Sequence, residues 1–259
     1  MRRLALLLLL LSLGAGATDG GPTAEQLIAR VEQARRTSGF RARARLVRTT
    51  SDSKKQEVQQ LLIKGRRQGG FTQVLYRVLW PKEAEGRALL VECSADGKAG
   101  GFLFEPPQTV TPLTRRIMGR SLFGSDLSVE DVAEEFWRWP SQALAGEAMV
   151  AARRCLILES RPGAGSESGY SLVRSWIAPD IALPLLIEKY GRDGRLLKRL
   201  VAAKVVKQSP GRWTVAILVI EAADGRSRTT LEGSRSERDL DLPAEQFTLE
   251  SIRNPLGRP

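Results

Sequence analysis

The sequence predicts a mainly β protein of the α+β class, with one antiparallel sheet of about ten or eleven strands and two or three helices. Short runs alternate apolar and polar residues, as Phe40 to Leu46 does with Arg41, Arg43 and Arg45 between. Turn-forming residues separate these runs at spacings too short for the crossovers that parallel strands need. Because no repeat or long linker divides the chain, we expect a single domain over residues 18–259.

Residues 1–17 have the pattern of a secretory signal peptide. Two arginines precede an apolar run at 4–13, and the small residues 15–17 supply a cleavage site. The alternative is an N-terminal membrane anchor, but a span needs about 20 apolar residues. We therefore expect cleavage near Ala17 and a soluble exported protein without a stable membrane span.

The first mature element is a helix that Thr23 and Gln26 begin as a capping box. Leu27, Val31 and Ala34 continue it at helical spacing, and it ends before Gly39. Alternating strands follow this helix. We expect them at 40–46, 57–64, 71–80, 86–93 and 101–105.

The middle of the chain, residues 106–124, contains three prolines and few alternating runs, so it predicts an excursion from the sheet. A capping box at Ser128 to Asp131 then begins a short helix that covers one face. Asp193-Gly194 and Asp224-Gly225 predict two hairpin turns in the second half. The strands expected there are 147–159, 169–177, 183–191, 196–207, 213–221 and 226–232.

Several of these strands are apolar on both faces, as in 148–158 and 213–219. Such a sheet needs cover on both sides, and two or three helices cover only part of one. The sheet therefore either closes around a core filled by side chains or curls around a cavity for an apolar ligand.

Composition excludes several kinds of site. The chain has no histidine and two cysteines, which excludes histidine-dependent catalysis, histidine-ligated metals and four-thiolate zinc. We expect no metal and no cofactor. Cys93 and Cys155 both lie in strand-like runs, so they form either one disulfide or two buried free thiols.

The chain is basic, with 40 lysines and arginines against 29 acidic residues. An exported protein does not ordinarily meet nucleic acid, so we expect anionic lipid headgroups or envelope polymers as partners rather than nucleic acid. Genomic bias towards arginine is the alternative explanation. The basic residues are scattered along the sequence and predict no single binding patch.

The string Gly124-Ser-Asp-Leu-Ser-Val-Glu-Asp131-Val resembles the signature of the outer-membrane lipoprotein-sorting protein family, the LolA-like periplasmic carriers. Leu127 and Val129 stand where that family has aromatic residues. Further segments resemble the family in the same order over roughly 70–255, which include Trp80-Pro81, 86–90, 102–106, 175–177, 184–190, 196–200, 229–231 and 247–248.

The resemblance implies a curled antiparallel half-barrel with two or three helices packed on its concave face. It implies a periplasmic, non-enzymatic protein that holds the acyl chains of lipoproteins or related envelope lipids, with an inner-membrane transporter complex as a further partner. It names no catalytic residue. Aromatic and branched residues would line the cavity, and the candidates are Trp80, Leu90, Phe102, Phe104, Trp176, Ile187 and Trp213. Core packing is the alternative for each.

The signature turn begins at Gly124 and concentrates side-chain oxygens at Ser125, Asp126, Ser128, Glu130 and Asp131. Helix capping explains Ser128 and Asp131, whereas the spacing lacks the pattern of a calcium loop. An exposed docking turn is the other interpretation.

Two functions follow from the sequence. The first is a carrier or chaperone for lipoprotein acyl chains or other envelope lipids. The second is an interaction module that docks on an envelope transporter or lipid-export complex. A carboxylate hydrolase has no sequence motif in its favour.

Overall fold

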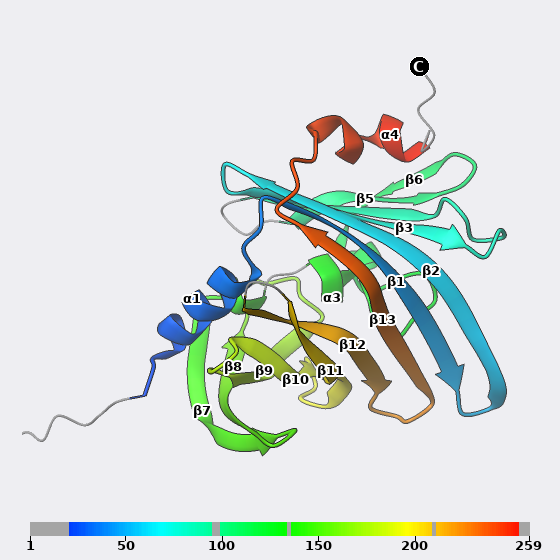
Figure 1. The fold of residues 1–259 in the computed structure, drawn as a ribbon. Helices are drawn as coiled ribbons and strands as arrows, with labels where there is room; N and C mark the ends of the chain where they lie inside the picture. The colour runs from blue at the N-terminus through cyan, green and yellow to red at the C-terminus, as the bar shows by residue number, and fades with distance from the viewer. Residues whose placement is uncertain (1–20, 95–98, 134–135, 209–210, 254–259) are drawn as a thin grey trace, which may run out of the picture.

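The computed structural model describes residues 21–94, 99–133, 136–208 and 211–253. The fold is built on one sheet of 13 strands, in the order β6-β5-β4-β3-β2-β1-β13-β12-β11-β10-β9-β8-β7. The described strands pair with their sheet neighbours in antiparallel register. The sheet is open and strongly curved (Figure 1), so the predicted mainly β, antiparallel class is confirmed. With 13 strands where ten or eleven were expected, the sheet is larger than the expected half-barrel.

Two meanders make up the sheet, and the β1–β13 pairing joins them. The first contains β1 (Gly39–Thr50), β2 (Ser53–Gln68), β3 (Phe71–Trp80), β4 (Ala88–Cys93), β5 (Ala99–Glu105) and β6 (Thr109–Pro112). The second contains β7 (Ser141–Val150), β8 (Arg153–Arg161), β9 (Tyr170–Ala178), β10 (Leu183–Gly191), β11 (Leu196–Gln208), β12 (Arg212–Ala222) and β13 (Ser227–Arg238).

The predicted strand count was too low at two places. The run 147–159 is a hairpin, because Ala151 and Ala152 adopt positive φ angles of 48° and 59° and reverse the chain between β7 and β8. An apolar run hides such a turn, since alanine carries no turn signal. The predicted excursion at 106–124 also contains the short edge strand β6, which pairs with β5.

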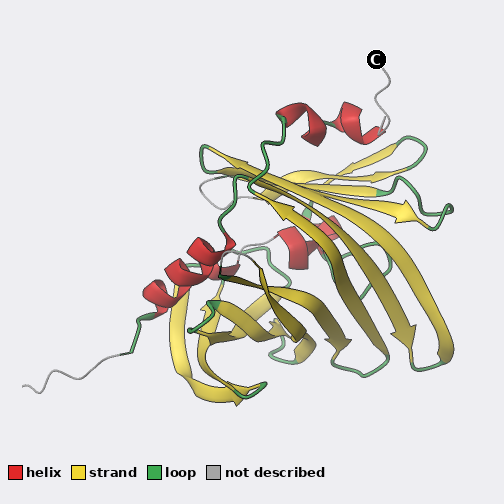
Figure 2. Cartoon of the chain, in the orientation of Figure 1, coloured by secondary structure: helices red, strands yellow, loops and turns green. Residues whose placement is uncertain are grey.

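The helices are short and lie on both sides of the sheet (Figures 1 and 2). They are α1 (Ala24–Arg35), α2 (Arg115–Met118), α3 (Val129–Ala133) and α4 (Leu249–Arg253), with 3₁₀ turns at Phe136–Arg138 and Ala244–Phe247. The capping box of α1 is present, because Gln26 N donates to Thr23 Oγ1 at 3.2 Å and Thr23 N to Gln26 Oε1 at 3.0 Å.

Two elements fill the concave side. Residues 113–133, which we name the plug, bury Ile117, Phe123 and Val129 against β1 to β5 and β10 to β12. Helix α1 buries Leu27 and Val31 against β8 and β9 at the other end. Each such apolar side chain contributes about 1.5–3 kcal/mol of burial free energy, so the plug and α1 hold the sheet in its curve.

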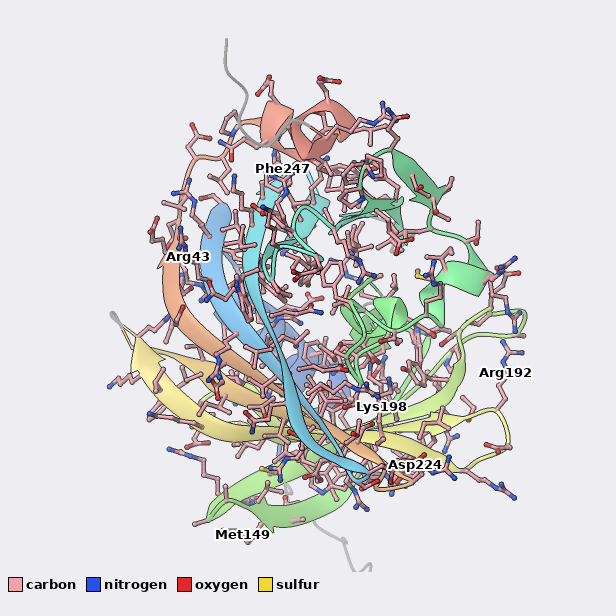
Figure 3. The ribbon with its side chains drawn as sticks, turned by 90° about the vertical axis from the view of Figure 1, so that its right-hand side faces the viewer. Arg43, Met149, Arg192, Lys198, Asp224 and Phe247 are labelled. Atoms are coloured by element: carbon pink, nitrogen blue, oxygen red, sulfur yellow. The ribbon has the colours of Figure 1, made fainter. Side chains whose placement is uncertain are left out.

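The C-terminal helix lies on the convex side, which corrects the expectation that the helices pack on the concave face. Phe247 and Ile252 pack against Leu75, Leu90 and Phe104 there. In Figure 3, Phe247 lies between this helix and the sheet. The predicted signal peptide at 1–17 lies outside the described residues.

Candidate functional site

A cavity of about 520 Å³ remains between the plug, α1 and the curved sheet. This volume is within the range of protein sites for small ligands. One wall is a row of directly paired residues that runs across five strands. The row is Val91, Val74, Gly65, Phe40 and Arg238, and cross-strand partners share one face of a sheet. The row therefore fixes which face of β1 to β4 is concave.

The opposite wall comes from the second meander. Ile187 pairs with Leu200, which pairs in turn with Ile220, so all three face the interior. Ile187 and Leu200 line the cavity, and Phe136 and Trp137 contribute aromatic rings. The walls are therefore mainly apolar.

Tyr76 is a polar group on the apolar wall of β3. Burial raises its pKa to about 12, which keeps its hydroxyl neutral over the physiological range.

Glycine at position 65 keeps part of this space open. A Cβ at Gly65 would overlap the ring of Phe40 on the neighbouring strand. Because glycine has no Cβ, the Phe40 ring can lie against the backbone of β2 at this position.

The signature segment forms a buried ionic network at the base of the cavity. Asp131 has a side chain that is 0% exposed, and its Oδ1 accepts from Lys189 Nζ at 2.7 Å and Tyr170 Oη at 2.6 Å. Its Oδ2 accepts from Lys198 Nζ at 2.8 Å and from Ser128 N at 2.7 Å. Each carboxylate oxygen therefore accepts two hydrogen bonds, one from a lysine amine and one from an uncharged donor.

The register of the β10–β11 hairpin explains why this carboxylate is needed. Lys189 and Lys198 are directly paired across the two strands, and the amines of both reach the buried Asp131. Like charges in that position repel each other, and Asp131 lies between them. Burial alone would raise the pKa of Asp131, but the charges and hydrogen bonds of the two lysines outweigh burial and hold it well below its usual range.

Two other acids of the signature fix the plug to other strands. Asp126 accepts from Thr229 Oγ1 at 2.7 Å and from Ser227 on β13. Glu130 accepts from Gly169 N at 2.9 Å, ahead of β9. The signature therefore anchors the plug at three points on the second meander.

The remaining signature residues shape the turn before α3. Gly124 has a φ of 85°, which favours glycine. Ser125 Oγ donates to Leu122 O at 2.7 Å, and Ser128 Oγ accepts from Asp131 N at 3.2 Å as a helix cap. Ser125, Ser128 and Glu130 are buried, so the segment is an internal anchor and not the exposed turn that a docking role assumes.

The seven residues predicted to line a cavity fall in different places. Ile187 and Trp213 line it. Leu90, Phe102 and Phe104 lie on the convex face with Phe247. Trp80 is 49% exposed at the end of β3. Trp176 packs in a cluster that contains Cys155 and Leu185.

A two-residue period explains this division. Alternation groups Leu90 with one face of β4 and Val91 with the other, but both faces are apolar, and the sequence does not say which is concave.

The pairing of Lys189 with Lys198 was a sequence signal that could have predicted the buried acid. The Asp193-Gly194 turn approximately fixes the hairpin register, and two inward lysines facing each other require a buried acid.

The two cysteines are free, buried thiols in different clusters, so the disulfide alternative is not formed. Among the described residues, no group of three acidic, cysteine or histidine side chains could hold a metal ion. No helix in the described part of the chain is long and apolar enough to cross a membrane.

Five arginines also line the cavity, at its open end. Arg35, at the end of α1, lies 5.0 Å from the centroid of the Trp137 ring. Arg138 is within 3.7 Å of Glu32. Arg66, Arg67 and Arg238 come from the ends of β2 and β13. The cavity thus has apolar walls and a basic opening.

Solved structures of low sequence identity share this fold. A DUF1329 family protein from Desulfovibrio piger is 23% identical, with a TM-score of 0.82 and coverage of 88% of this chain and 97% of that one. A putative outer membrane lipoprotein-sorting protein domain from Vibrio parahaemolyticus is 18% identical, with a TM-score of 0.79 over 89% and 99% of the two chains.

A third similar structure is a LolA superfamily protein from Nitrosomonas europaea, at 18% identity, a TM-score of 0.71 and coverage of 89% and 99%. A protein-family model whose description reads "uncharacterized protein" matches residues 70–254. The search of curated proteins finds no match. The sequence resemblance to the lipoprotein-sorting proteins is thereby confirmed for the fold.

Proposed function

We propose that this chain, which belongs to the family whose model spans residues 70–254, is a non-enzymatic periplasmic carrier. It holds acyl chains of lipoproteins or related envelope lipids in its cavity. The observation that carries this proposal is the cavity of about 520 Å³ with mainly apolar walls. The signal-peptide pattern at 1–17 supports an exported location.

The physical requirement for such a carrier is the cost of exposing hydrocarbon to water. Each buried methylene contributes about 0.8 kcal/mol, so a long acyl chain does not cross an aqueous compartment unaided. The plug and α1 leave space between them where the row from Val91 to Phe40 and the Ile187–Leu200 pair provide apolar contact. A transfer protein needs this shelter and no chemical step.

A cavity-filling variant tests the proposal. Val74 lies in the concave row, so Val74→Trp places an indole where the acyl chain would lie. Displacing two methylenes costs about 1.6 kcal/mol, which lowers affinity more than about tenfold. Gln73→Trp is the matched control, because Gln73 lies on the same strand, faces the other way and bonds to Glu92.

The measurement is mass spectrometry of amphiphiles extracted from full-length protein purified from the bacterial envelope. We expect stoichiometric amphiphile with the native protein and the control, and a large loss with Val74→Trp. A native protein that is consistently empty, and that also takes up no amphiphile in vitro, would contradict the carrier proposal. It would favour the interaction module, for which salt-sensitive capture of an envelope complex is the expected result.

A further inference from the structure

The open end of the cavity concentrates positive charge from two separate parts of the chain. We name Arg67 and Arg238, which pair with the cavity-lining Thr72 and Phe40, the arginine mouth. Arg238 pairs with Phe40, Arg66 pairs with Gly39, and Arg67 N donates to Ser38 O at 2.8 Å. The start of β1 therefore brings the ends of β2 and β13 together at the opening.

The acids that line the same cavity already have partners. Asp131 binds Lys189 and Lys198, and Glu32 lies 3.7 Å from Arg138. Within the described part of the chain, the two residues of the arginine mouth form no ion pair. The neighbouring Arg66 points to the other face of β2, where it donates to the amide oxygen of Gln68. The mouth thus presents guanidinium groups that no carboxylate of the cavity neutralises.

Arg238 experiences this excess charge directly. Burial and then the positive charge of Arg212 lower its pKa; Asp239 opposes them, and Arg35 adds a smaller lowering effect. A bound anion would relieve the repulsion. Guanidinium groups bind phosphate and carboxylate through paired hydrogen bonds, which suits a headgroup at the mouth.

We propose that the cavity selects an anionic amphiphile, whose hydrocarbon lies against the concave row while its phosphate or carboxylate headgroup binds the arginine mouth. This proposal rests on the carrier function and adds the chemical class of the cargo. The apolar walls and the basic opening belong to one continuous cavity, so a single molecule satisfies both. A neutral lipid would leave the arginines without a counter-charge.

The test uses three probes with the delipidated full-length protein. Hexadecyl phosphate and hexadecylphosphocholine carry the same chain and a phosphate, and differ in net headgroup charge. Inorganic phosphate has no chain. Isothermal titration below the micellar concentration of each amphiphile measures affinity. We expect hexadecyl phosphate to bind at least about tenfold more tightly than the zwitterion, since hydrogen bonds between charged groups are the stronger ones.

Variants link this preference to the mouth. Arg67→Gln combined with Arg238→Gln should reduce the preference for hexadecyl phosphate to less than about threefold. Arg195→Gln combined with Arg226→Gln is the matched control. It removes the same charge from two hairpin turns, where the side chains are 85% and 83% exposed, and should leave the preference unchanged. Thermal unfolding checks that both double variants fold.

The possible outcomes separate the two proposals. Equal affinity of the native protein for both amphiphiles would overturn charge selection and leave the carrier function standing. Binding of neither amphiphile would count against the carrier function itself. Inorganic phosphate that binds as tightly as hexadecyl phosphate would reduce the mouth to an anion site without an acyl chain. A preference that the mouth variants and the control lower equally would place its origin in overall charge.

Discussion

The buried network around Asp131 gives the sharpest stability prediction. Asp131→Asn keeps the shape of the side chain but removes its charge. The carboxylate accepts four hydrogen bonds of 2.6–2.8 Å, two at each oxygen. An amide accepts at one oxygen only, so its NH₂ group would face either Lys189 and Tyr170 or Lys198 and Ser128.

The magnitude follows from the charge count. The native network has two lysines and one carboxylate, and the variant leaves both lysines buried without a counter-charge. Lys189 is only 2% exposed. Removing one partner of a buried ion pair costs about 3–5 kcal/mol, which we expect as the loss in free energy of unfolding. Lys189→Met should cost less, because Asp131 and Lys198 remain as a neutral pair.

Urea denaturation followed by circular dichroism measures these differences. Glu147→Gln is the control, since it removes a carboxylate from an exposed pair with Arg154, and it should cause no measurable change. A loss below about 1 kcal/mol for Asp131→Asn, the range of surface pairs, would refute the reasoning. So would a larger loss for Lys189→Met than for Asp131→Asn.

The same network predicts the response to acid. Its lysines hold the pKa of Asp131 below the unfolded value of about 4. A carboxyl group with a depressed native pKa stabilises the fold above the unfolded pKa, and this contribution is lost as pH falls towards the native value. We therefore expect native stability to fall more steeply below about pH 4 than that of Asp131→Asn. Parallel profiles would contradict this.

Three further predictions concern the cavity wall, the convex face and the thiols. Gly65→Ala should displace the Phe40 ring, lower stability by about 1–3 kcal/mol as overpacking does, and reduce the amphiphile recovered by mass spectrometry; unchanged recovery would argue against the assigned wall. Phe247→Ala should cost about 3–5 kcal/mol in urea denaturation but leave amphiphile affinity intact, because Phe247 packs on the convex face. Cys93 and Cys155 should react with a thiol reagent only after denaturation, as two thiols per chain; no reactive thiol in denatured, unreduced protein would indicate a disulfide between them.

Local signals in the sequence determined much of the fold. Alternation and turn residues predicted the antiparallel meander, and Thr23 with Gln26 predicted the start of α1. The signature at 124–131 predicted a capped short helix in the middle of the chain. These features depend on residues within a few positions of each other, so propensity and hydrogen bonding act on them before any tertiary contact forms.

The site depended on long-range contacts. A period of two separates Leu90 from Val91 but does not say which face the sheet curves around; the plug on one side and Phe247 on the other decided that. Asp131 meets lysines 58 and 67 residues away. The arginine mouth likewise joins residues from the ends of β2 and β13. Such contacts are set by strand order and register, which emerge only when the two meanders pair along β1 and β13.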